Sequence, residues 1–158
     1  LFSIPDAIAV LKNDYDIYNT SPKLISDWRW YKGVTGDDRG FNQIALDCYY
    51  KNNLNLIDYR YEFKPHSIGF GQKLEYLCNE VWDIMCTIQN GNSLQLGAFK
   101  EKLSEVSKFI EKKAPKTSEA IGDSLHWLDC GAPIEAKLEH LPKWWGRGQQ
   151  YASFIKKY

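Results

Sequence analysis

The chain has 158 residues, and its 20 basic and 20 acidic side chains give a formal net charge of zero. Apolar residues make up 44% and charged residues 25% of the chain, which is typical of a globular protein and excludes a disordered or collagen-like one. The balanced charge argues against nucleic-acid binding, because phosphate contacts dominate the affinity of proteins that bind nucleic acid. The length and composition indicate one globular domain over residues 1–158, and the patterns below predict that it is helical.

The first residue is Leu1 and the only methionine is Met85, so we expect this domain to belong to a longer parent chain. No apolar run approaches the roughly 18 residues of a membrane span, and we expect no contact with a membrane. The four cysteines form no Cys-x-x-Cys pattern, which argues against a zinc site, and we expect buried free thiols in a reducing cytoplasm. They are Cys48, Cys78, Cys86 and Cys130.

Helical patterns begin at Ser21-Pro22, where an N-cap residue is followed by proline. A second helical stripe starts at Phe41, after a glycine-rich turn. The segment 57–64 is ambiguous, because it alternates like a strand while Leu56, Tyr59 and Phe63 also fit a helical stripe. We favour a helix there, since a lone strand has no partner.

The strongest periodic signal is a central helix in which apolar residues recur at steps of four and three. A similar pattern covers 97–113, and Thr117-Ser118 predicts the start of another helix. Pro133 predicts a short helix to Leu141, and we expect a last helix carrying Tyr151, Phe154 and Ile155. The central stripe is Phe70, Leu74, Leu77, Val81, Ile84 and Ile88. The sequence therefore predicts an all-α fold, an irregular bundle of six to seven helices around a single layer-packed core.

Three of the four arginines stand between aromatic residues, namely Arg29, Arg60 and Arg147. Arginine stacks on rings and makes bidentate contacts to carboxylates and phosphates, so these clusters predict a site for a flat or anionic group. We place that site on the first and last clusters. The candidate ligand-binding residues are Trp28, Arg29, Trp144, Trp145, Arg147, Gln149 and Tyr151.

Each cluster also has a structural interpretation. Trp144 and Trp145 would cap the core, and Arg147 would pair with a core carboxylate such as Asp27 or Asp58. The sequence leaves both interpretations open, and it does not show whether clusters more than 100 residues apart meet in space.

We expect no metal site and no cofactor. Asp123 and His126 lie on one helix face, but the chain has no Glu-x-x-His motif of the kind that di-iron bundles use. Glu80 and Asp83 flank the central apolar stripe, which favours solvated carboxylates over an acid–base pair. Catalytic residues therefore remain unidentified, and we do not expect the isolated chain to be catalytic.

These patterns favour an accessory domain that binds a small anionic or flat polar ligand for a larger cytoplasmic group-transfer enzyme, such as a methyl- or glycosyltransferase. The alternative is a protein–protein interaction module, because Trp, Tyr and Arg dominate interaction hot spots. Self-association or an apolar surface patch would favour the alternative.

Overall fold

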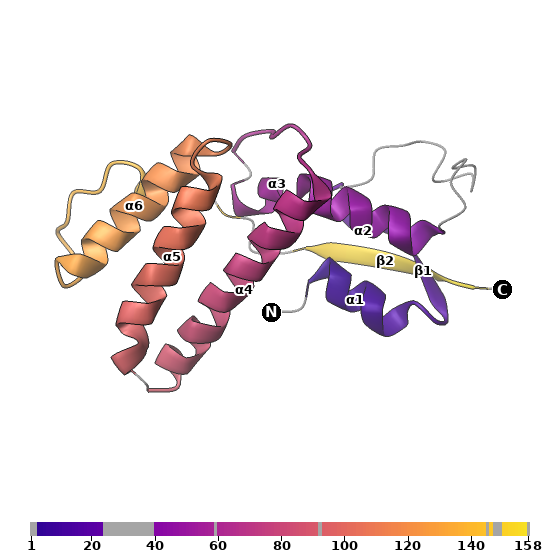
Figure 1. The fold of residues 1–158 in the computed structure, drawn as a ribbon, viewed down its shortest axis with the longest axis horizontal. Helices are drawn as coiled ribbons and strands as arrows, with labels where there is room; N and C mark the ends of the chain where they lie inside the picture. Colours follow the sequence, from indigo (N-terminus) through magenta and orange to yellow (C-terminus); the bar gives the residue numbers. More distant parts are fainter. Residues whose placement is uncertain are drawn as a thin grey trace.

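The computed structural model describes residues 3–23, 40–58, 60–91, 93–144, 146 and 150–157. These residues form a mostly helical structure with a small two-stranded sheet (Figure 1). Two short 3-10 turns, η2 (Ser93–Gln95) and η3 (Leu141–Lys143), join longer elements. The helices are α1 (Ile4–Leu11), α2 (Phe41–Asn52), α3 (Leu54–Ile57), α4 (Ile68–Gln89), α5 (Leu96–Ile110) and α6 (Pro115–Asp129), and the strands are β1 (Tyr15–Ser21) and β2 (Tyr151–Lys156).

The first half of the structure packs α1 and α2 against the sheet. β1 and β2 run antiparallel, with Tyr15 opposite Lys156 and Ser21 opposite Tyr151. The side-chain amide of Asn42 in α2 forms two hydrogen bonds with the backbone of β1. It accepts from the Ile17 N–H at 2.8 Å and donates to the Tyr15 carbonyl at 3.0 Å. The buried side chains here are Ile4, Ile8, Ile17, Ala45 and Tyr49.

The second half is a layer in which α4, α5 and α6 lie side by side (Figure 1). Its core joins Leu54 of α3 and Leu74 of α4 to Ile110 and Ala114, and the rings of Phe70 and Phe109 stack at 4.5 Å. None of the described helices combines the length and the apolar composition that crossing a bilayer requires.

The two halves meet where α2 crosses α4. A Cβ atom added at Gly71 would lie 1.8 Å from the Tyr50 carbonyl oxygen, so the backbones touch at a position that only glycine allows. The Asn53 side chain secures the crossing by donating to the Gly71 carbonyl at 2.8 Å.

The helices with strong apolar periodicity are confirmed. The predicted central helix is α4, which ends at Gln89 with Asn90 as its C-cap, and the helices predicted from Phe41 and over 97–113 are α2 and α5. α6 begins at Pro115, two residues before the Thr117 start that the sequence predicted. The fold is therefore broadly helical, although it is not strictly all-α.

Four expectations are wrong. The predicted last helix is β2, in which Ala152 and Phe154 face the first core while Tyr151, Ser153 and Ile155 are exposed. The short helix predicted from Pro133 is absent, because the segment 133–140 contains turns and no helix. The helix favoured over 57–64 is also absent, because the described residues from the end of α3 to position 67 form neither helix nor strand. Among the residues that the structure describes, the buried side chains form two clusters and not a single core. Ser21 is the last residue of β1, and the helix predicted after it lies outside the described residues.

The close crossing of α2 and α4 predicts that Gly71→Ala lowers the stability of the protein, whereas the same substitution at an open helical glycine raises it. Gly71→Ala should lower the free energy of unfolding by about 1–3 kcal/mol, because the new methyl group meets a backbone carbonyl. Gly122→Ala in α6 is the matched control, since a Cβ there meets nothing within 4 Å, and it should raise the free energy by roughly 0.5–1 kcal/mol. Chemical denaturation of both variants checks this, and equal stabilisation by both would contradict the close crossing.

Candidate functional site

An apolar pocket of about 210 Å³ lies between α4, α5 and α6, and the indole of Trp144 forms part of its wall. Trp144 follows η3, so a segment outside the three helices completes the pocket. The other lining residues come from α3, α4, α5 and α6, and they are Ile57, Cys78, Val81, Leu103, Val106, Thr117 and Ile121. This lining suits an apolar or aromatic group.

The two polar side chains in this lining are not free to act as charges. Burial raises the pKa of the Cys78 thiol to about 11, helped by the negative charge of Glu75, so the thiol is protonated at neutral pH. The Thr117 hydroxyl donates to the Asp58 carboxylate at 2.8 Å. The pocket therefore presents neutral walls.

Trp144 is positioned by η3, and the start of η3 is fixed by Asp123 of α6. One oxygen of Asp123 accepts from the N–H groups of His140 at 2.6 Å and Leu141 at 3.0 Å. Burial raises the pKa of Asp123, but these two hydrogen bonds outweigh it and hold the pKa below its ordinary value. The Trp144 N–H then donates to the Leu141 carbonyl at 3.1 Å.

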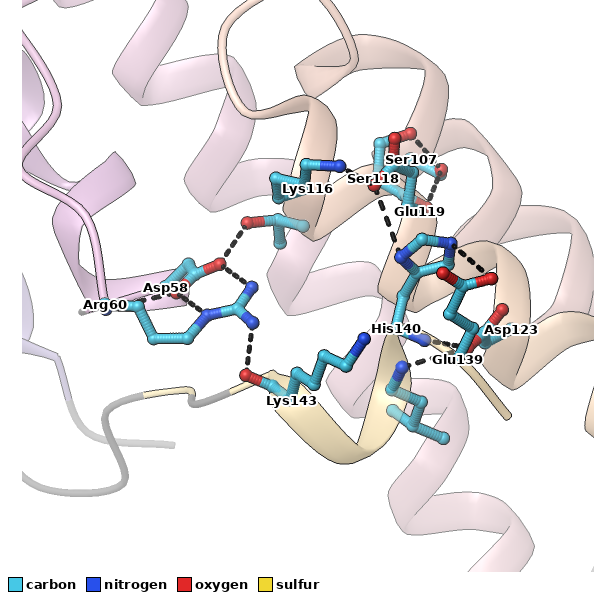
Figure 2. A network of polar contacts seen from close by, with 12 residues as sticks. Asp58, Arg60, Ser107, Lys116, Ser118, Glu119, Asp123, Glu139, His140 and Lys143 are labelled. Carbon is cyan, nitrogen blue, oxygen red and sulfur yellow. Dashed lines mark hydrogen bonds and ion pairs between the residues drawn. The ribbon is translucent and has the colours of Figure 1, made fainter. Parts of the chain in front are cut away.

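The end of η3 is fixed by Arg60, which is itself held by a fully buried carboxylate. Asp58 is 0% exposed, and it accepts from Arg60 Nε at 2.9 Å and from Arg60 Nη2 at 2.7 Å. The remaining arm of the guanidinium, Nη1, donates to the Lys143 carbonyl. Figure 2 shows Asp58 beside Arg60, with Arg60 reaching the Lys143 carbonyl. These contacts, which we call the Asp58 clamp, join the end of α3, the start of α6 and η3.

The clamp compensates the cost of burying a charge. An unpaired buried ion costs several kcal/mol, whereas Asp58 has a bidentate arginine and a hydroxyl donor. Burial raises the pKa of Asp58, but the hydrogen bonds from Arg60 and Thr117 outweigh it and leave the pKa below the ordinary value. The carboxylate is therefore charged in the folded protein at neutral pH.

A second hollow, of about 220 Å³, lies beside the clamp and is lined by charged groups. Lys116 pairs with Glu119 at 2.9 Å, and His140 lies 3.4 Å from the same carboxylate. The Lys143 ammonium makes no hydrogen bond or ion pair with any other residue that the structure describes. The lining residues are Arg60, Tyr61, Lys116, Glu139, His140 and Lys143. This hollow therefore offers a cation beside the segment that carries Trp144.

Only part of the predicted ligand site can be compared with the structure. Trp144 lines the apolar pocket, and its ring lies against Gly146, where an added Cβ would be 2.7 Å from the indole. Tyr151 is 62% exposed on β2 and is not among the residues that line the pocket. The other predicted residues lie outside the described residues, so the meeting of the two clusters stays a prediction. They are Trp28, Arg29, Trp145, Arg147 and Gln149.

Sequence reasoning missed the residues that hold the site together. Asp58 appeared there only as a possible partner of Arg147, whereas it accepts from Arg60 and Thr117. The Asp-x-Arg spacing of Asp58 and Arg60 was the available signal, because it places a donor beside the carboxylate. Burial of Asp58 depends on the packing of α6, which the local sequence does not encode.

The other groups that the sequence raised as candidates, the Glu80 carboxylate and the cysteines, lie outside this site or do not form one. Glu80 accepts from Tyr76 and Lys102 on the exposed face of α4, as a solvated carboxylate should. All four cysteines are free, but Cys130 is exposed and the others are half-buried, so the expectation of buried thiols is wrong. Within the described ranges, no group of three or more His, Cys, Asp or Glu residues is placed to hold a metal ion.

The clamp predicts a stability loss that depends on pH. Asp58→Ala should lower the free energy of unfolding at pH 7 by about 1–3 kcal/mol, because it leaves the buried Thr117 hydroxyl without its acceptor and releases Arg60. The pKa of Asp58 is lower in the folded than in the unfolded state, so the wild-type contribution is present above the ordinary value of 3.8 and is lost as the pH falls through the folded value.

Denaturant titrations between pH 7 and pH 3 check this, with Asp58→Asn expected to remove that part of the pH dependence. Asp129→Asn is the control, because Asp129 forms an exposed pair with Lys100 and should change stability by less than about 1 kcal/mol. Equal behaviour of the two Asn variants would contradict the clamp.

Comparison with known proteins identifies no relative of the chain. No protein-family model, no curated protein and no solved structure matches the chain.

Proposed function

We propose that this chain is a helical ligand-binding domain that holds the apolar ring of a small molecule in the Trp144 pocket. In this proposal the domain is the accessory part of a larger group-transfer enzyme, whose reacting groups lie elsewhere. The observation that carries the proposal is that one wall of an apolar pocket is a tryptophan that follows η3, and that η3 is held at its start by Asp123 and at its end by Arg60.

The volume of the pocket suggests the size of the ligand group. An apolar cavity of about 150 Å³ accommodates benzene, so about 210 Å³ suits a single substituted aromatic ring. The ring would contact the indole of Trp144, and aromatic contacts add about 0.5–1.5 kcal/mol beyond the area they bury. The protonated Cys78 thiol fits a binding role, because a thiol is a far weaker nucleophile than a thiolate.

The second hollow suggests the polar end of the ligand. Lys143 immediately precedes Trp144 and lines that hollow together with Lys116. An acidic substituent on the ring would gain from the Lys143 ammonium, which has no partner among the described residues. We therefore favour an aromatic carboxylate or phosphate over a neutral ring, in keeping with the flat or anionic ligand that the sequence predicts.

Binding of simple aromatic acids tests the proposal. Phenylacetate and phenyl phosphate should raise the melting temperature and shift the NMR signals of the Val81, Leu103 and Ile121 methyl groups, and benzyl alcohol should bind more weakly than either. Trp144→Ala should weaken binding about tenfold, which corresponds to ~1.4 kcal/mol. Val81→Phe should abolish binding by filling the pocket.

Trp82→Ala is the matched control, because Trp82 lies on α4 but is not among the residues that line the pocket. It should leave the affinity for phenyl phosphate unchanged. Absence of binding by all three compounds to the folded chain would overturn the proposal and favour the protein-interaction alternative. Binding that survives Val81→Phe would place the ligand elsewhere.

A further inference from the structure

The two edges of the small sheet differ, and the edge formed by β1 is partly covered. The Ile17 N–H and the Tyr15 carbonyl bond the side-chain amide of Asn42, so these backbone groups face away from β2. Backbone groups of successive residues alternate between the two sides of a strand. The Asp14 carbonyl accordingly faces β2 and accepts from the Lys157 N–H at 2.8 Å.

The same alternation shows which backbone groups form the outer edge of β2. Ile17 lies opposite Phe154, and Tyr15 lies opposite Lys156. In both pairs the β1 residue turns its backbone groups outward, so Phe154 and Lys156 do the same on β2, and so does Ala152. These three residues form no backbone hydrogen bond with any other residue that the structure describes. An edge of this kind is a template for pairing with another extended chain.

A hollow of about 240 Å³ lies between β2 and α1, which run side by side in Figure 1. The side chains of Ala152 and Phe154 line this hollow and pack against the first core. A further strand beside β2 would place every second side chain on the same face as these two residues. The other lining residues are Ser3, Ile4, Ala7, Leu11 and Gln150. An apolar side chain of the added strand can therefore occupy the hollow.

The chemistry of this edge fits a separate peptide better than a second copy of this chain. In a second copy paired through its own β2, the side chains on this face would be Ala152 and Phe154, which already pack in the core of that copy. They would not be available to fill the hollow. Lys156 is exposed and forms no ion pair with any other described residue, so an acidic residue placed opposite it would be favourable.

We propose that the outer edge of β2 binds an extended peptide as a third, antiparallel strand of the sheet. Apolar side chains of the peptide lie over the hollow beside α1, and a carboxylate lies opposite Lys156. Backbone hydrogen bonds supply the affinity, and the hollow supplies the preference for particular side chains. The Trp144 pocket takes no part in this binding, so the inference goes beyond the proposed function and is tested separately from it.

Amide hydrogen exchange in the free chain tests whether the edge is open. The Ile155 N–H faces β1, whereas those of Phe154 and Lys156 face outward. After correction for intrinsic rates, we expect the two outward amides to exchange about tenfold faster than Ile155 or more, because they lack a hydrogen-bond acceptor. Equal protection of all three amides would mean that the edge is already paired, and it would overturn the proposal.

The peptide acetyl-Glu-Thr-Leu-Thr-Leu-Thr-amide tests the binding itself. In antiparallel register it places its Glu opposite Lys156 and its two Leu opposite Phe154 and Ala152. It should slow exchange of the Phe154 and Lys156 amides and shift the methyl signals of Ala7 and Leu11. The same peptide N-methylated at its first Leu is the control. It keeps every side chain but loses a backbone donor, and it should bind about tenfold more weakly or less.

Two variants of one residue separate backbone pairing from charge. Lys156→Pro removes the outward N–H, which an edge strand tolerates, and it should weaken peptide binding about tenfold or more. Lys156→Ala keeps the N–H and should weaken binding only about twofold to fivefold, through the lost charge. Circular dichroism shows that each variant is folded. The proposal is overturned if the peptide does not bind the wild-type chain, or if it binds as tightly when N-methylated.

Discussion

The buried carboxylate of Asp58 is the constraint on which the arrangement around the pocket depends. A charge that is 0% exposed is tolerated only when donors surround it, and its donors come from two separate parts of the chain, Arg60 and Thr117. Arg60 then reaches the Lys143 carbonyl. The start of α6 and the turn before Trp144 are thereby located relative to α3. An apolar pocket formed by four helices and a loop needs such a fixed point, since apolar contacts alone are non-directional.

The segment that carries Trp144 is anchored on both sides along the chain. Before it, η3 is held by Asp123 and Arg60, and after it β2 pairs with β1 near the other end of the sequence. The close crossing at Gly71 in turn fixes the half that contains the sheet against α4. The pocket wall at Trp144 therefore depends on both halves of the structure, even though its other lining residues belong to the helical layer.

The sequence allowed prediction of what is local. The helices α2, α4 and α5 carry apolar side chains at steps of three and four, and that pattern needs no knowledge of the rest of the fold. β1 and β2 escaped prediction because Tyr15 pairs with Lys156, and neither strand alone shows a decisive pattern. In β2 the spacing of Tyr151, Phe154 and Ile155 also fits a helix, and only pairing with β1 decides. Among the residues that line the pocket, Trp144 was a predicted ligand-binding residue because of its aromatic and arginine-rich neighbourhood. Asp58 and Thr117 were missed, because their contact joins residues 59 positions apart.

The claim that the Asp58 clamp positions Trp144 is tested most directly by measuring the solvent exposure of the Trp144 indole in an Arg60 variant. In protein labelled with 5-fluorotryptophan, Trp144→Phe identifies the fluorine resonance of Trp144, and its solvent isotope shift reports exposure of the indole. Arg60 lies outside the apolar pocket, so Arg60→Gln changes the support of the wall and not the wall itself. We expect the isotope shift of Trp144 to rise towards that of a fully exposed tryptophan in Arg60→Gln, while the other tryptophan resonances stay in place. An unchanged chemical shift and isotope shift for Trp144 in the folded variant would contradict the claim that the Asp58 clamp positions it.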